Sequence, residues 1–139
     1  RTASNLLLFL YMPSYRFPKK ERLSRKKLWE AVFEEGARLK SFPLLLFYLT
    51  TPLPEDITIQ AGFSVPKRTF RSAVDRNRIK RLMKEAYRLE KPLIFNNMQG
   101  NYAFVFLYLG REPADFTALS KAMKAVLAKF MLHEKDTEN

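Results

Sequence analysis

ITIQAGFSVPKRTFRSAVDRNRIKRLMKEAYRLE, residues 57–90, is the stretch that decides the fold. Its first part, residues 57–65, alternates apolar residues with small or polar ones, which is typical of a strand with one buried face. Its last part, from about Ser72 to Leu89, repeats apolar residues at helical spacing, and Pro92 is expected to end that helix. The stretch therefore predicts a strand, a basic turn and a long amphipathic helix.

Further elements are expected on both sides of this stretch. Ser24 suits the start of a helix and Gly36 suits its end, in the left-handed conformation. Aromatic and aliphatic runs at 42–50 and 102–109 predict two more strands, the second of them central, and a last helix opens near Asp115. The predicted order is α-β-β-α-β-α, which indicates an α+β fold with helices packed on a small sheet.

The length of 139 residues suits one domain with a core of its own. We expect an N-terminal arm or an upstream remnant over residues 1–16, the folded domain over 17–133 and a polar tail over 134–139. The apolar run at residues 6–12 is too short to span a membrane. The chain has no cysteine, which fits a reducing compartment, and we expect it in the cytoplasm.

The positive charge is concentrated in two segments. The chain has a net charge of +11, and residues 16–27 hold seven Lys or Arg against one acid. Residues 64–91 hold ten Lys or Arg against three acids. Such clustering favours a nucleic-acid partner, with an anionic membrane surface or an acidic protein as the alternatives.

One face of the predicted helix collects the positive charges. When residues are stepped by about 100°, one arc carries six polar groups: Arg76, Asn77, Lys80, Arg81, Lys84 and Arg88. The opposite arc is apolar, while Arg78 and Glu85 lie at the border. A row of cations on a stiff helix suits a phosphate backbone. A solvated surface face and a membrane-surface helix are the alternatives.

The sequence around this helix also resembles a known family. FSVPKR at residues 63–68 and AVDRNRIKRLMKEAYR at residues 73–88 resemble the signature of the bacterial ribonuclease P protein subunit, whose core is the RNR motif. The resemblance continues in FPKKERL at residues 17–23, and it extends over about residues 17–132. Trp29 and Phe33 match aromatic positions of the family.

The resemblance implies a function and two RNA partners. Members assist a catalytic RNA that removes the 5′ leader from precursor tRNA, and the RNA holds the magnesium ions. The expected partners are therefore ribonuclease P RNA and precursor tRNA, with no membrane, no protein partner and no cofactor bound by the chain alone. The resemblance also implies a left-handed βαβ crossover, against the usual right-handed sense.

Two sets of residues are expected to contact RNA. The set facing the catalytic RNA is Lys67, Arg68, Arg71, Arg76, Asn77, Arg78, Lys80, Arg81, Lys84 and Arg88. The set lining a cleft for the single-stranded leader is Phe17, Lys20, Arg22, Trp29, Phe33, Gln60 and Ser64. Unpaired bases stack on aromatic rings without strong sequence preference. For Trp29 and Phe33 an ordinary place in the core remains the alternative.

The chain offers few residues for chemistry of its own. Its one histidine, His133, lies in the predicted polar tail, and its acids are scattered, so no catalytic residue and no metal site is expected. An autonomous nuclease is therefore disfavoured. The remaining alternative is a basic ribosomal-type or DNA-binding module with no role in tRNA processing.

Overall fold

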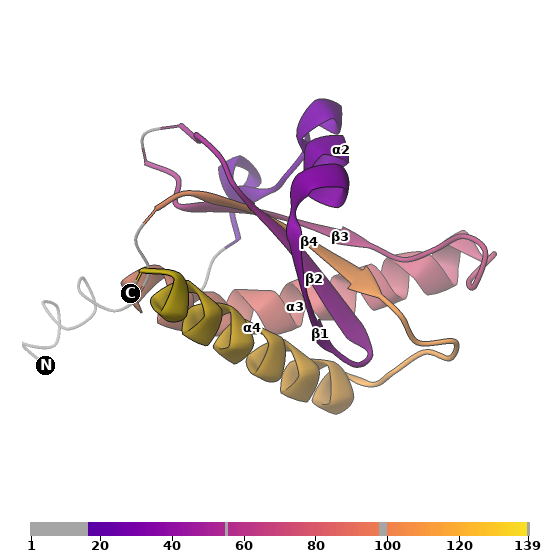
Figure 1. The fold of residues 1–139 in the computed structure, drawn as a ribbon. Helices are drawn as coiled ribbons and strands as arrows, with labels where there is room; N and C mark the ends of the chain where they lie inside the picture. The colour runs from indigo at the N-terminus through magenta and orange to yellow at the C-terminus, as the bar shows by residue number, and fades with distance from the viewer. Residues whose placement is uncertain (1–16, 55, 98–99, 139) are drawn as a thin grey trace, which may run out of the picture.

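A four-stranded sheet organises the chain in the computed structural model, which describes residues 17–54, 56–97 and 100–138 (Figure 1). The elements in chain order are η1 (Lys19–Glu21), α2 (Lys26–Glu35), β1 (Ala37–Ser41), β2 (Leu44–Thr50), β3 (Ile59–Ser64), α3 (Ala73–Asn97), β4 (Tyr102–Tyr108) and α4 (Phe116–Glu138). The α+β class with helices packed on a small sheet is confirmed.

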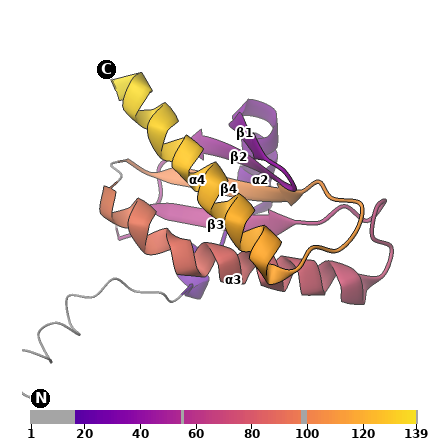
Figure 2. The same ribbon diagram turned by 90° about the horizontal axis from the view of Figure 1, so that it is seen from below.

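The strand order is β1-β2-β4-β3, so the predicted central place of the 102–109 strand is also confirmed. β2 pairs antiparallel with β1 and with β4, whereas β3 and β4 run parallel and are joined through α3. In Figure 2, α3 crosses in front of the sheet, both strands run to the right and β4 lies above β3. With the strands turned upward, β4 lies to the left of β3, which is the left-handed sense.

The helices cover the two faces of the sheet unequally. α3 and α4 lie side by side on one face, and α2 lies on the other (Figures 1 and 2). The larger core joins the first face to α3 and α4 through fully buried side chains such as Phe104, Phe106 and Phe130. A smaller core, with Val32 and Val105 among its residues, lies under α2.

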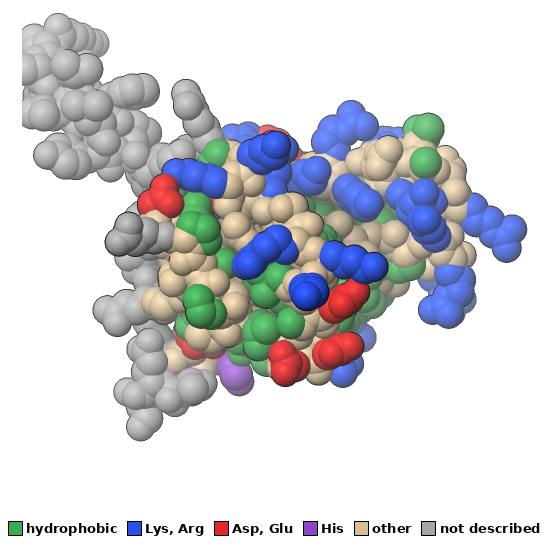
Figure 3. Space-filling model, turned by 90° about the horizontal axis from the view of Figure 1, so that it is seen from above, with side chains coloured by type: hydrophobic (Ala, Val, Ile, Leu, Met, Phe, Trp, Pro, Cys, Tyr) green, Lys and Arg blue, Asp and Glu red, His purple; other side chains and the backbone are tan. Residues whose placement is uncertain are grey.

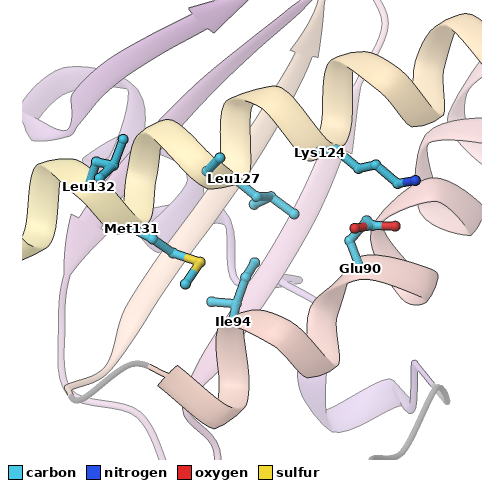
Figure 4. A pocket seen from close by; sticks show the side chains of 7 residues that line it. Glu90, Ile94, Lys124, Leu127, Met131 and Leu132 are labelled. Carbon is cyan, nitrogen blue, oxygen red and sulfur yellow. The ribbon is translucent and has the colours of Figure 1, made fainter.

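A groove opens between α3 and α4 near their C-terminal ends. It encloses about 380 Å³, and its lining is mostly apolar. Figure 4 shows Ile94, Leu127 and Met131 pointing into the same space, with Glu90 and Lys124 at one end. Ile94 is fully buried, which shows that α3 continues to pack on α4 beyond Pro92.

The helix boundaries differ from prediction in two places. α3 does not end at Pro92 but runs through it to Asn97, because the packing of Ile94 against α4 outweighs the hydrogen bond that a proline cannot donate. α4 continues to Glu138, so the predicted polar tail at 134–139 begins inside a helix. In the described ranges no helix is long and apolar enough to cross a membrane.

Around α2 the prediction of the local structure was wrong in three respects. α2 begins at Lys26 after Arg25, without a side-chain cap from Ser24. Gly36 has φ −73°, not the left-handed conformation. A Cβ on Gly36 would lie 2.8 Å from the carbonyl oxygen of Tyr48, so close approach explains the glycine. The edge strand β1 was missed, because its charged residues Arg38 and Lys40 hide its pattern.

Candidate nucleic-acid interface

Most of the basic face predicted for α3 is exposed in the structure. Ile79, Met83 and Ala86 are buried against the sheet, which turns the opposite side of the helix to solvent. That side presents the exposed residues Asn77, Arg78, Arg81 and Lys84, with Lys80 half-buried between them. In the part of the chain that the structure describes, the four cations of this set have no carboxylate within ion-pair distance.

The β3–α3 turn adds three more cations beside the start of α3. Lys67, Arg68 and Arg71 are all exposed, and Phe70 anchors the turn by packing into the core. Ser72 Oγ accepts a hydrogen bond from the Asp75 backbone N–H at 3.3 Å, which caps the helix. In Figure 3, Lys and Arg side chains crowd the right-hand end of the molecule, where this turn lies in Figure 1.

Arg76 has a second role that the helical pattern did not reveal. Its Nη1 donates to the carbonyl oxygens of Phe70 at 2.8 Å and Arg71 at 2.9 Å. The guanidinium therefore ties the basic turn to the first turn of α3. The sequence feature that could have indicated this role is an arginine four residues after a helix-capping serine. The two carbonyl oxygens that the arginine contacts are brought together only by the geometry of the turn.

At the C-terminal end of the basic face, Arg88 is less available for an RNA contact than predicted. Glu85 lay at the border of the wheel, yet its carboxylate reaches Arg88, whose Nε donates to Oε1 at 3.0 Å. This hydrogen bond lowers the pKa of Glu85 below its ordinary value and raises the pKa of Arg88. Arg88 would have to share or leave this partner to contact a phosphate.

The predicted leader-binding residues lie on two sides of β3. Trp29, Phe33, Gln60 and Ser64 lie on the α2 side of the sheet. Phe17 does not join them, because its ring packs edge-on against Phe63 and Tyr87 on the α3 side. Its apolar ring packs against the larger core. The sequence alone does not show whether an aromatic residue at this position packs in the core or lines a cleft.

Trp29 packs on the sheet at a place where β3 has no side chain. A Cβ on Gly62 would meet the indole ring, at 2.8 Å from Cη2. The indole Nε1–H donates to the carbonyl oxygen of Leu23 at 2.9 Å. Phe33 is 36% exposed and its ring contacts Phe47 at a centroid distance of 4.8 Å. The two aromatics are thus anchored by packing but remain partly open to solvent.

Lys20 and Arg22 are held along the outer edge of β3. Lys20 Nζ lies 2.7 Å from Asp56 Oδ2, and this hydrogen bond raises the pKa of Lys20 and lowers that of Asp56. Gln60 Nε2 donates to the Lys20 carbonyl oxygen at 3.0 Å. Arg22 lies over the Phe17 ring at 5.5 Å.

A hollow next to Gln60 brings in residues that were not predicted. It encloses about 470 Å³ between the start of α2 and the loop before β3. Its lining is Ser24, Arg25, Pro52, Leu53, Pro54 and Gln60. Arg25 belongs to the first basic segment of the sequence, and that local charge was the signal that could have indicated it.

Carboxylates and the histidine do not gather into a catalytic cluster in the described ranges. No group of three or more His, Asp or Glu side chains there is arranged to hold a metal ion. The Nδ1 atom of His133 lies 2.5 Å from the Tyr48 hydroxyl at the end of α4, far along the chain from the basic face.

Comparison with known proteins identifies the family. A family model described as Ribonuclease P matches residues 17–131. The chain belongs to the ribonuclease P protein family. It is 35% identical over 120 residues to the ribonuclease P protein component of Porphyromonas gingivalis, covering 84% of this chain and 88% of the relative. Over 131 residues it is 42% identical to that of Chlorobium phaeobacteroides, with the same two coverages.

Solved ribonuclease P proteins share the fold. The Staphylococcus aureus protein gives a TM-score of 0.63 at 16% identity, covering 78% of this chain and 93% of that one. The Thermotoga maritima protein gives 0.62 at 20% identity, covering 78% and 96%. The chain is thus a ribonuclease P protein subunit, an RNA-binding component of tRNA processing, and the alternative of an unrelated basic module is not favoured.

Proposed function

We propose that this subunit binds the catalytic RNA of ribonuclease P through the basic face of α3 and the β3–α3 turn. The observation that carries the proposal is the row Arg78, Lys80, Arg81 and Lys84, whose charges are not neutralised by carboxylates in the described ranges. Such a row can replace the counterions of a phosphate backbone. Asn77, exposed among the cations, supplies a neutral donor and acceptor for a base edge or a 2′-hydroxyl.

The α2 side of the sheet is the proposed path of the 5′ leader of precursor tRNA. Trp29 and Phe33 offer partly exposed rings for stacking, and Gln60 and Ser64 extend the surface along β3. Lys20, Arg22 and Arg25 supply positive charge at its edge. Stacking and phosphate contacts tolerate many sequences, which suits a subunit that meets many leaders.

The chemistry is assigned to the RNA and to magnesium ions that it holds. The side chains assembled here are cations and aromatic rings, which bind and orient RNA but do not activate water. The subunit would therefore assist hydrolysis by positioning the precursor. We propose that the subunit acts in the cytoplasm. The chain has no cysteine, so its fold does not need the disulfide bonds that form in oxidising compartments.

A reconstitution assay tests this function. The protein is mixed with its cognate catalytic RNA and 5′-labelled precursor tRNA at low magnesium, and the rate is compared with that of the RNA alone. Strong stimulation of leader removal is expected. Arg81→Ala should weaken stimulation, whereas Lys121→Ala, which removes an exposed lysine from α4, should not. Lack of stimulation by the wild type would reject the proposal, and cleavage by the protein alone would move the chemistry to the chain.

A further inference from the structure

Lys91 is an unusual residue for the interior of a small basic protein. It is 2% exposed and is the charged residue that is buried within the described ranges. Its Nζ lies 2.5 Å from Oε1 of Glu21, whose side chain is 14% exposed. The pair joins the C-terminal half of α3 to η1, which lies 70 residues earlier in the chain.

Stability alone is a poor explanation for this ion pair. Removing two charges from water costs about as much as their attraction returns, so apolar replacements of buried pairs are often neutral or stabilising. Removing one partner, in contrast, strands the other charge in a dry site. A buried ion pair of this kind therefore raises the free energy of any conformation in which η1 and α3 do not bring the two charges together.

The segment that carries Glu21 crosses from one face of the sheet to the other. At its start, Phe17 packs on Tyr87 and Phe63 on the α3 side. At its end, the Leu23 backbone N–H donates to the Ala61 carbonyl oxygen at 2.9 Å, and the Leu23 side chain enters the core under α2. Residues 17–23, which we call the lead-in segment, thus run round the edge of β3 from one RNA surface to the other.

Glu21 lies at the middle of this path, between the cations of the lead-in segment. Its neighbours Lys20 and Arg22 are exposed, whereas Glu21 turns inward to Lys91. Tyr87, one helical turn before Lys91, is buried beside the same carboxylate, whose charge adds to burial in raising the pKa of the phenol. The contact of this carboxylate with Lys91 therefore ties the chain between Lys20 and Arg22 to α3.

We propose that Glu21 and Lys91 are positioning residues, which hold the lead-in segment against α3 so that the leader-binding surface keeps a fixed place relative to the basic face. This inference rests on the proposed function, because it requires both surfaces to contact one RNA assembly. Two contacts on one rigid body bind cooperatively only while their spacing matches the partner. Loosening the segment would also make the ordering of Lys20 and Arg22 a cost of each binding event.

Binding measurements with two precursor tRNAs test the inference. One precursor carries a leader long enough to cross the sheet, and the other carries a leader of one nucleotide. Glu21→Gln and Lys91→Met, each in the complex with the catalytic RNA, should weaken binding of the long-leader precursor about tenfold. Binding of the short-leader precursor and of the catalytic RNA should stay at the wild-type level.

The double variant Glu21→Gln/Lys91→Met separates positioning from stability. Removing both charges should return the melting temperature close to that of the wild type, because no buried charge is left unpaired. Leader affinity should remain low, because a neutral contact does not fix the lead-in segment. Glu35→Gln, which makes the same change at the exposed end of α2, is the charge-matched control and should leave both quantities unchanged.

Two outcomes would overturn the inference. One is recovery of leader affinity together with melting temperature in the double variant, which would make the pair purely stabilising. The other is an equal loss of affinity for both precursors. A wild-type protein that fails to stimulate the catalytic RNA at all would instead reject the proposed function, so the two failures are distinguishable.

Discussion

Arg76 was expected to contact a phosphate, but in the structure its guanidinium is bonded to the protein backbone. Because its Nη1 holds the carbonyl oxygens of Phe70 and Arg71, truncation should release the turn that carries three cations. A single phosphate contact contributes about one released ion to the salt dependence of RNA binding. Arg76→Ala is therefore expected to lower the number of released ions by more than that. Arg81→Ala should lose about one ion. The measurement is the slope of log Kd against log salt, and equal slopes for the two variants would show that the turn stays in place.

Gly62 offers a residue-scale test of how Trp29 is seated. In Gly62→Ala the new Cβ would lie 2.8 Å from Cη2 of the indole, so the ring has to leave the sheet. Overpacking of this kind costs roughly 1–3 kcal/mol in unfolding free energy. Trp29 is the single tryptophan of the chain, so the tryptophan emission reports on this ring alone. Because the displaced ring becomes exposed to water, its emission should shift to the red. Thr58→Ala, one residue before the same strand, serves as the control, and an unshifted spectrum for Gly62→Ala would contradict the expectation.

Single residues show where sequence reasoning stops. The helical wheel correctly separated the buried Ile79 and Met83 from the exposed Arg81 and Lys84, because both faces follow from one period. It failed for Phe17, whose place depends on which core lies nearer in three dimensions. Whether Trp29 and Phe33 stack on RNA stays a prediction, although their partial exposure is compatible with it.

At the scale of elements, α3 tolerates a proline that should have ended it. Pro92 has no backbone N–H to donate to the Arg88 carbonyl, and α3 nevertheless continues to Asn97. Pro92→Ala restores that donor, so we expect the unfolding free energy to rise by about 1 kcal/mol after the loss of buried ring contacts. Urea unfolding measures it. A lower free energy would mean that the packing of the ring outweighs the hydrogen bond.

The elements divide into those with a local signal and those without one. β3 and α3 were predictable because alternation and helical spacing lie within single segments. β1 was not, since its two outward cations suit an edge strand as well as a loop, and only its register with β2 decides between them. The left-handed crossover followed from the family resemblance, because no local pattern encodes handedness.

The whole molecule should respond to alkaline pH through its buried tyrosines. Tyr87 is fully buried, and burial, with a smaller effect of Glu21, raises the pKa of its phenol above the ordinary 10.0. Above pH 10 the unfolded chain releases this proton while the folded chain retains it, so stability present below that pH is lost as pH rises. The loss is about 1.4 kcal/mol at pH 11 for one tyrosine that stays neutral when folded.

Tyr87→Phe provides the matched comparison for this prediction. Unfolding by urea at several values between pH 8 and 11 should show a smaller decline in the variant, because phenylalanine has no proton to release. Absorbance near 295 nm should rise with unfolding rather than before it. Parallel pH profiles for the two proteins would show that Tyr87 ionises in the folded state.

The place of β4 has a consequence for how the protein is made. β4 lies between β2 and β3, yet it is the last strand to leave the ribosome. Until residues 102–108 have emerged, β2 has an open inner edge and β3 has no strand partner, and such edges invite pairing with other chains. The nascent chain therefore passes through a period in which β1 and β2 can form a hairpin but the sheet cannot close. Synthesis that stalls before Tyr102 should yield aggregates rather than a smaller folded protein.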